Sequence, residues 1–327
     1  MRAALARGIR WSRPSPRCES DHCYSPGSAR FTSDGDLEVT GGLTFAANSY
    51  AAPECRRRAL FVTGQVSVST IECGPGRGSS QNTQTFDQPA IVFLRTGRYG
   101  RRVGGRASIV DSTQCYLLPS GETEEIQHLG DGHRSTVLTL ASERLPTLLR
   151  VRSRFAAFEF RTCAAVDLAH RLMLAECRRG GETTVITDMA MALVAELFAA
   201  WTHSPPAARR RGTSAATRRV VDIARELATT GSVPRSLQSI ATAASVSPQY
   251  LTRLFRQSTG LTLTSYRNRV RVRLALERIA EVETDLKRVA HELGFFDQSH
   301  FSRTVRAEIG LLPSTLRTLL FVPDATP

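Results

Sequence analysis

The chain has 327 residues, of which 41% are hydrophobic and 22% are charged, close to the average of globular proteins. At about 150 residues per domain this length indicates two domains, and the composition excludes a wholly disordered or collagen-like chain. The most apolar stretch of the chain is Met191–Trp201, and Glu196 interrupts it. This stretch is therefore shorter than the ~18 apolar residues that a membrane helix needs. We therefore expect no membrane partner.

The chain is strongly basic, with 43 Lys and Arg against 30 Asp and Glu and a net charge of +13. An excess of this size is typical of proteins that bind a polyanion such as nucleic acid. The charge is also concentrated, since no acidic residue lies between Glu226 and Glu277, where seven arginines occur. This stretch indicates a surface that faces phosphates, although a solvated basic helix face would give the same pattern.

The first 35 residues are rich in Arg, Ser and Pro and lack the apolar core of a secretory signal, which predicts a mobile lead-in over 1–35. The seven cysteines lack the close spacing of a small secreted scaffold. We therefore expect free thiols in a reducing, cytoplasmic compartment.

From about residue 36 to 142, short β-prone runs alternate with turn residues, which predicts an all-β sandwich or barrel. The predicted strands include Leu60–Val62, Val66–Ile71, Ala90–Leu94, Ala107–Val110, Cys115–Leu118 and Thr136–Leu140. The predicted breaks lie at 75–78, 96–100, 104–105, 119–122 and 130–132.

Near residue 150 the apolar spacing becomes helical, and two amphipathic helices are predicted on either side of Gly180-Gly181. Their apolar faces carry Leu168, Leu172 and Ala175 in the first helix and Ile186, Met189, Leu193 and Leu197 in the second. Such a pair packs either on its own barrel or on a partner chain, and the sequence leaves both open. Pro-Pro and a triple arginine then predict a linker at 203–216, followed by helices only to about 320.

Residues 237–260 fit a helix-turn-helix, which needs a small residue where two helices cross, a turn, and apolar anchors. Ala241 is the small residue, Ser245 occupies the turn where Gly is commoner, and Ser247 is an N-cap candidate before Pro248. The expected anchors are Ile240, Val246, Leu251, Leu254 and Phe255. The side chains left for base edges and phosphates are Gln249, Tyr250, Thr252, Arg253 and Arg256.

A second copy of this plan begins 49 residues later, counted from Ala241 to Ala290, and its turn is one residue longer. Gly294 lies at the turn and Asp297 is the N-cap candidate. The expected anchors are Val289, Leu293, Phe295, Phe301 and Val305. The side chains left for a groove are Gln298, Ser299, Ser302, Arg303 and Arg306.

Between the two copies, apolar spacing predicts a connecting helix from about Leu263 to Ala280. About 18–20 helical residues span roughly 27–30 Å, which is close to the ~34 Å between successive major-groove faces. We expect the basic face of this connector, which carries Arg267, Arg269, Arg271 and Arg273, to lie near the DNA backbone.

Residues 217–320 resemble the DNA-binding domain of the AraC/XylS family of bacterial transcription regulators. The resemblance rests on the string GFFDQSHFSRTVRAEIGLLPSTLR, which departs from the family at Val305, usually Phe, and at Leu316, often aromatic. Both departures imply a smaller anchor. The resemblance implies promoter DNA and RNA polymerase as partners and places the groove residues against bases, although Arg303 is equally compatible with a structural or phosphate role.

Residues 91–140 resemble, more weakly, the cupin-like sensor and dimerisation region of AraC-type activators. The resemblance implies a cupin-like barrel with two helices over 36–202, a small-molecule effector, and a homodimer formed through 145–202. Residues that could line the effector pocket, each also compatible with core or surface, are Phe93, Arg95, Tyr99, Cys115, Gln127 and His128. The expected architecture is an all-β cupin-like barrel followed by an all-α double helix-turn-helix domain.

Two other functions have sequence requirements of their own. A cupin enzyme needs a His-x-His pair for its metal, and the sequence contains none, so we expect no catalytic residues, cofactor or metal. A repair regulator with a cysteine-rich zinc domain needs four closely spaced thiolates, whereas only Cys18 and Cys23 lie close together, and Cys55 and Cys73 are isolated in sequence. We therefore expect a transcription regulator controlled by its N-terminal domain.

Overall fold

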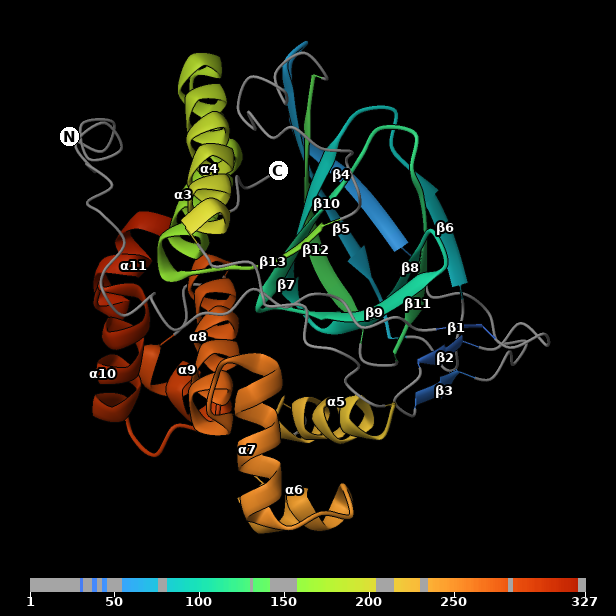
Figure 1. The fold of residues 1–327 in the computed structure, drawn as a ribbon. Helices are drawn as coiled ribbons and strands as arrows, with labels where there is room; N and C mark the ends of the chain where they lie inside the picture. The colour runs from blue at the N-terminus through green and yellow to red at the C-terminus, as the bar shows by residue number, and fades with distance from the viewer. Residues whose placement is uncertain are drawn as a thin grey trace.

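The computed structural model describes residues 30–31, 37–39, 43–45, 55–75, 81–129, 132–141, 158–203, 215–229, 235–281 and 285–322. Within these ranges a β-rich N-terminal part is followed by helices only, so the predicted succession of an all-β and an all-α part is confirmed (Figure 1). Most of the lead-in and the linker, predicted at 1–35 and 203–216, lies outside the described residues.

Two large antiparallel sheets face each other in the N-terminal part (Figure 1). The six-stranded sheet has the order β13-β10-β7-β12-β5-β4, and the four-stranded sheet has the order β6-β11-β8-β9. The cupin-like barrel is therefore not a closed ring. The strands are β4 Cys55–Val62, β5 Val66–Cys73, β6 Gln81–Thr85, β7 Ala90–Thr96, β8 Arg98–Val103, β9 Arg106–Asp111, β10 Gln114–Leu118, β11 Thr123–His128, β12 His133–Leu140 and β13 Phe158–Arg161.

The six predicted strands are all present, but the sequence missed β6, β8, β11 and β13. Strand β8 starts inside the break predicted at 96–100, and β13 lies where the resemblance placed helices. A third, small sheet consists of β1 Arg30–Phe31, β2 Leu37–Val39 and β3 Leu43–Phe45, so a strand begins inside the predicted lead-in. Short or polar strands of this kind carry little of the apolar alternation on which the prediction depends.

The space between the two large sheets is filled by side chains. Its apolar part includes Val92, Leu94 and Ile126, all buried. A polar network completes it: Arg101 Nε donates to Glu124 Oε2 at 2.5 Å, and the Tyr116 hydroxyl donates to Glu124 Oε1 at 2.9 Å. Since each charged group here has a partner, burying the pair is tolerated.

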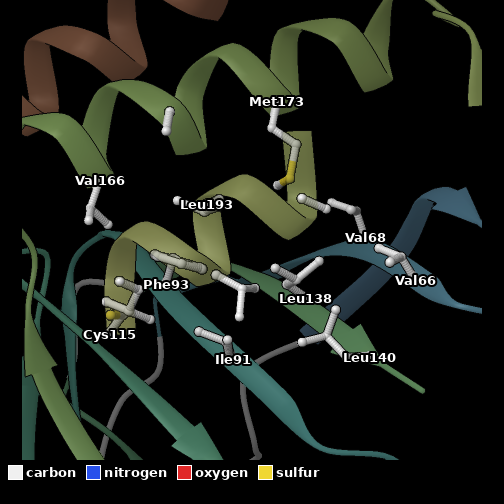
Figure 2. Close-up of a cluster of buried hydrophobic side chains, with 14 of the residues drawn as sticks. Val66, Val68, Ile91, Phe93, Cys115, Leu138, Leu140, Val166, Met173 and Leu193 are labelled. Carbon is white, nitrogen blue, oxygen red and sulfur yellow. The ribbon is translucent and has the colours of Figure 1, made fainter. Parts of the chain in front are cut away.

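Helices α3 Ala164–Arg178 and α4 Thr183–His203 cover the outer face of the six-stranded sheet (Figure 2). Along β7, Ile91 and Phe93 point to these helices while their neighbours point between the sheets, which is the alternation expected of a strand buried on both faces. Met173 and Leu193 meet them from the helix side. Packing on the protein's own sheet, one of the two open alternatives, is therefore observed.

Helix α4 is more apolar than the interruption at Glu196 led us to expect. Its Thr183–Ala200 window of 18 residues has a mean hydropathy of 1.5, long and apolar enough to cross a membrane by length and composition. Ile186, Leu193 and Leu197, however, are buried in the core under the six-stranded sheet. A core helix of a globular protein meets the same criterion, and these three residues show that one face of α4 packs in such a core.

The C-terminal part consists of seven helices among the described residues. They are α5 Ala215–Thr229, α6 Leu237–Ala243, α7 Pro248–Thr259, α8 Leu263–Glu281, α9 Leu286–Glu292, α10 Gln298–Ile309 and α11 Pro313–Leu320. Helix α8 contributes Tyr266 and Val270 to a core with α5, α6 and α7, and Val272 and Leu276 to a second core with α9, α10 and α11. The two cores are thus joined through one helix (Figure 1).

The two parts of the chain dock on each other through buried charged groups. Glu277 of α8, 3% exposed, forms an ion pair with Arg95 of β7, 3.1 Å between Oε1 and Nη1, and accepts a hydrogen bond from Arg171 of α3. Asp111 at the end of β9 lies 2.6 Å from Arg225 of α5 and accepts a hydrogen bond from the Tyr266 hydroxyl at 2.8 Å. Helix α3 also packs its apolar side chains Ala164, Leu168 and Leu172 on the core of the last four helices.

The expectation that all cysteines are free is wrong for two of them. Cys55 and Cys73 face each other across β4 and β5, with their Cα atoms 4.1 Å apart, and form a disulfide. The strand register brings them together over a separation of 18 residues that the sequence pattern does not reveal. Cys115, Cys163 and Cys177 are not in a disulfide, and Cys18 and Cys23 lie outside the described residues.

Candidate nucleic-acid interface

The first helix-turn-helix unit consists of α6 and α7 and is built as predicted. Ile240 and Ala241 are fully buried where the helices cross. The Ser247 side chain accepts a hydrogen bond from the Tyr250 backbone N–H at 3.2 Å, which confirms it as the N-cap of α7, and Pro248 follows at the first helical turn. Leu251, Leu254 and Phe255 anchor α7 in the core, as expected.

The second unit, α9 and α10, repeats this construction. The Asp297 carboxylate accepts from the His300 backbone N–H at 2.6 Å and caps α10. Phe295, Phe301 and Val305 are buried together, so the valine anchor fits a core filled by two aromatic rings in edge contact. The turn is one residue longer than in the first unit, as predicted.

The turns of the two units have the same backbone geometry. The N–H of Val246 bonds to the Ala241 carbonyl oxygen at 3.0 Å, and the equivalent bond in the second unit runs from Phe295 to Ala290 at 2.9 Å. Each bond closes a turn that contains one residue with a positive φ, Ser245 with 55° in the first unit and Gly294 with 69° in the second. The left-handed residue turns the chain sharply and lets the next apolar side chain enter the core.

The side chains predicted to contact DNA lie on the outer faces of α7 and α10. All ten are exposed except Ser302, which is partly buried. On α7 the Arg253 guanidinium lies over the Tyr250 ring, 5.5 Å from its centroid, and Thr252 donates to the Pro248 carbonyl at 2.9 Å. Stacking on the ring restricts the arginine fork while leaving its donors available to a partner. Their contacts with bases remain a prediction.

The arginines of the connector, in contrast, are not the free phosphate-facing row that was expected. Arg273 is 5% exposed and lies 2.6 Å from Asp167 of α3. Arg269 pairs with Glu308 at 3.5 Å, and Arg271 lies over the Phe295 ring at 5.5 Å. Two arginines of the stretch without acidic residues are thus paired with carboxylates from distant parts of the chain, which a local count of charges cannot detect. The predicted helix itself is confirmed as α8.

The six residues expected to line an effector pocket do not lie around one cavity. Phe93 and Cys115 face the helix core, where Phe93 stacks on His170 at 4.4 Å between centroids. Arg95 is held by Glu277 in the contact between the two parts of the chain. Tyr99 is buried between the sheets, its hydroxyl 2.9 Å from that of Tyr116. Gln127 and His128 are buried at the end of β11.

Sequence reasoning missed Asp111 and Glu277 as functional candidates. Burial would raise the pKa of Asp111, but Arg225 and the hydrogen bonds from Thr113 and Tyr266 outweigh it and leave the pKa below its usual value. Tyr266 and Asp111 are 155 residues apart, so no local signal could pair them. The sequence signal that could have pointed to Glu277 is its position as the first acidic residue after the stretch without acidic residues.

Comparison with known proteins agrees with this geometry. A family model described as a helix-turn-helix domain matches residues 240–318. The transcriptional activator RhaS of Pectobacterium carotovorum subsp. carotovorum (strain PC1) is 34% identical over 83 residues, 25% of this chain and 30% of the relative. The uncharacterised regulator YijO of Escherichia coli (strain K12) is 32% identical over 80 residues, 24% of this chain and 28% of that protein. The C-terminal region belongs to the AraC-type helix-turn-helix family.

The AraC-type domain is the part that these relatives share, because the chain spans less than a third of the length of the curated proteins it matches. Among solved structures, an AraC-type regulator from Chromobacterium violaceum has 25% identity and a TM-score of 0.31, covering 34% of this chain and all of that chain, 100%. ToxT from Vibrio cholerae O395 has 11% identity and a TM-score of 0.33, covering 79% of this chain and 99% of that one.

Proposed function

We propose that this protein is a sequence-specific, duplex-DNA-binding transcription regulator. The observation that carries the proposal is the pair of capped recognition helices, α7 and α10, each anchored in its own core and each with a polar outer face that includes two exposed arginines. An α-helix with such a face fits the major groove, where arginine forks read guanine and amide or hydroxyl groups read adenine or either base. The relatives' names, transcriptional activator and transcriptional regulator, support the same function.

In this proposal the N-terminal domain, 36–202, controls the AraC-type domain, 217–320, and acts through small-molecule binding rather than catalysis. The buried contacts of Glu277 and Asp111 support this coupling, because they join β7, α3 and β9 directly to α8 and α5. A ligand that moves the sheets relative to α3 would also shift α8, and both recognition units pack on α8.

The remaining partners are proposed on the same basis. A cytoplasmic regulator of this type would contact RNA polymerase, and a homodimer would form through helices in 145–202. Helix α4 supports the homodimer, because only a third of its apolar 18-residue window is buried in the single chain, 33%. The exposed positions of this helix include Ala195, whose small side chain would let a helix of a second copy approach closely.

The function is tested with the full chain and a library of randomised duplexes. We expect repeated selection to enrich one sequence, with affinity that falls steeply as salt rises, because phosphate contacts release counterions. The double variant Arg253→Ala, Arg303→Ala should bind that sequence at least about 10-fold more weakly, because it removes one base contact worth ~1–3 kcal/mol and one phosphate contact.

The control for charge is Arg58→Ala, which removes one exposed positive charge from β4 in the N-terminal domain. This variant should bind with nearly unchanged affinity. Failure to enrich any sequence, or equal losses in the control and the double variant, would contradict specific recognition by α7 and α10.

A further inference from the structure

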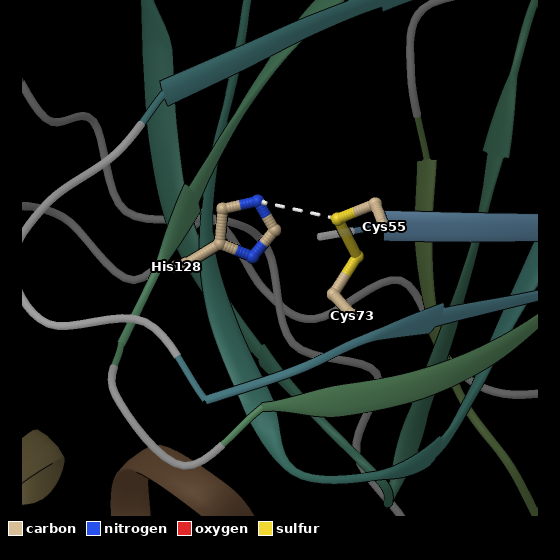
Figure 3. Close-up of a disulfide and its surroundings, with 3 residues drawn as sticks. All are labelled: Cys55, Cys73 and His128. Atoms are coloured by element: carbon tan, nitrogen blue, oxygen red, sulfur yellow. Dashed lines mark hydrogen bonds between the residues drawn. A yellow bond between two sulfur atoms is a disulfide. The ribbon is translucent and has the colours of Figure 1, made fainter. Parts of the chain in front are cut away.

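Three metal-ligating side chains that are far apart in sequence converge at one end of the N-terminal sheets (Figure 3). Cys55 begins β4 and Cys73 ends β5, directly opposite each other. His128 ends β11 in the other large sheet, and its Nε2 lies 3.9 Å from Cys55 Sγ. The two sulfurs and one imidazole nitrogen all lie within 4.8 Å of one another.

This spacing is close to that of ligands around a tetrahedral zinc ion. With Zn–S of about 2.3 Å and Zn–N of about 2.0–2.1 Å, neighbouring ligand atoms are roughly 3.6–3.8 Å apart. The sulfur of Cys55 and the nitrogen of His128 already have nearly this separation, 3.9 Å. The bond between the two sulfurs is the one contact that must open before an ion can enter.

The surroundings suit an ion that enters from one side. Cys73, His128 and His133 are buried, whereas Cys55 is exposed. His133 lies directly opposite Cys73 on β12, and its ring stacks on that of His128 at 5.1 Å between centroids. Cys73 and His133 also line a cavity of ≈ 540 Å³. Three protein ligands would therefore leave a fourth position that faces this cavity and holds water or a small anion.

We propose that Cys55, Cys73 and His128 form a binding site for a thiophilic divalent cation of the zinc class, and that the disulfide is the oxidised form of this site. Two sulfurs and an imidazole nitrogen favour such an ion over calcium or magnesium, which prefer oxygen ligands. The site is distinct from the recognition helices and does not depend on DNA binding.

The interconversion of the two forms balances as follows. A dithiol reductant gives two electrons and two protons to the disulfide and is itself oxidised to a disulfide, so that Cys55 and Cys73 become thiols. Binding of the cation displaces both thiol protons to solvent. A peroxide reverses the process: the two thiolates lose two electrons and form the S–S bond, the peroxide takes up two electrons and two protons and becomes water, and the cation leaves.

The test uses the full chain carrying Cys18→Ser and Cys23→Ser, which removes the other closely spaced thiols. The protein is reduced with a phosphine under inert gas, loaded with zinc and freed of excess ion by gel filtration. We expect about one zinc per chain, and with cobalt(II) a near-ultraviolet absorption band from thiolate to metal. Cys55→Ser, Cys73→Ser and His128→Gln should each lower zinc affinity at least about 100-fold.

Cys163→Ser, at a half-buried cysteine outside the disulfide and just before α3, is the matched control and should leave zinc affinity unchanged. Circular dichroism of Cys55→Ser, a change at an exposed position, verifies that loss of zinc is not loss of fold. One equivalent of hydrogen peroxide should release the ion and remove two thiols from reaction with a thiol reagent. A reduced chain that retains no zinc, or an affinity that none of the three changes lowers, overturns the proposal.

Discussion

Ser245 is the one non-glycine residue with a positive φ in the part of the chain that the structure describes. A left-handed backbone costs a residue with a Cβ about 1–2 kcal/mol, and glycine avoids this but loses about 0.5–1 kcal/mol through its freer unfolded chain. Ser245→Gly should therefore raise the free energy of unfolding by up to about 1 kcal/mol. Urea unfolding of the full chain measures it.

The equivalent change in the other unit, Gly294→Ala, should lower stability, since Gly294 has a φ of 69°. Neither change alters the outer face of α7 or α10, so DNA affinity should stay the same at low temperature. Destabilisation by Ser245→Gly would mean that the serine side chain contributes more than the backbone strain removes.

The two recognition helices are expected to divide their work at the level of single arginines. Arg253 is restricted by the Tyr250 ring, whereas no ring contact is found for Arg303 among the described residues. Arg253→Ala should erase preference at one base position at a cost of about 1–3 kcal/mol, and Arg303→Ala should weaken all sequences evenly and reduce the salt slope by about one unit. Binding to single-base variants of the selected duplex decides the matter. The assignment is reversed if Arg303→Ala alone removes a base preference.

His170 should make the stability of the protein depend on pH. Burial, with added repulsion from Arg171, Arg95 and Arg178, holds the pKa of this imidazole well below its ordinary value. The folded chain keeps it neutral while the unfolded chain binds a proton below about pH 6.5, so stability falls as pH drops through that value.

We expect His170→Phe to reduce this slope by up to about 1.4 kcal/mol per pH unit, the most one proton can contribute. The phenyl ring can keep the stacking on Phe93. Unfolding measured in urea between pH 5 and 7.5 tests this. Since burial also lowers the pKa of His128 and His133, a residual slope should remain, and an unaltered slope in the variant would exclude His170 as a cause.

At the scale of elements, the sequence predicted what local spacing encodes. The α7 helix was located to within a residue because its N-cap, Pro248 and anchors all lie inside one short segment. Strand β8 was missed because Arg101 is buried there through a partner, Glu124, 23 residues away. Neither β8 nor β11, the strand that carries Glu124, shows a regular alternation of apolar and polar residues, so a local reading of the sequence assigns both to loops.

The same reason separates the two candidate sites. The exposed faces of α7 and α10, which we propose to contact DNA, follow from helical periodicity within each unit, so their residues can be named from the sequence. The cysteine–histidine cluster could not be, because His128 is 73 residues from Cys55 in sequence and meets it only when the two sheets face each other. Contacts between elements depend on strand register and topology, which the local pattern of a single sequence does not specify.

At the scale of the whole molecule, the two domains should be separable only in part. The composition of 203–216 predicts preferential protease cleavage there. The nicked fragments should still elute together from a gel-filtration column, because Glu277, Arg95 and Arg171 join them in a buried contact. First cleavage elsewhere would refute the proposed boundary.

Glu277→Gln should let the nicked fragments separate, since it leaves two buried arginines without their carboxylate at a cost of about 3–5 kcal/mol. Glu292→Gln, which disrupts only the exposed Arg288–Glu292 pair, is the matched control and should leave the fragments together. Equal elution of both variants would mean that the remaining contacts, among them Asp111 with Arg225 and the apolar packing of α3, hold the domains together.

Helix α8 lends buried side chains to both cores of the AraC-type domain, Tyr266 to one and Leu276 to the other. Neither helix-turn-helix unit can lose its core without exposing part of this shared helix, so the two units form a single cooperative folding unit rather than two. Although the motif occurs twice in the sequence, the two copies do not unfold independently of each other. A substitution that destabilises the core of one helix-turn-helix unit therefore also lowers the stability of the other unit.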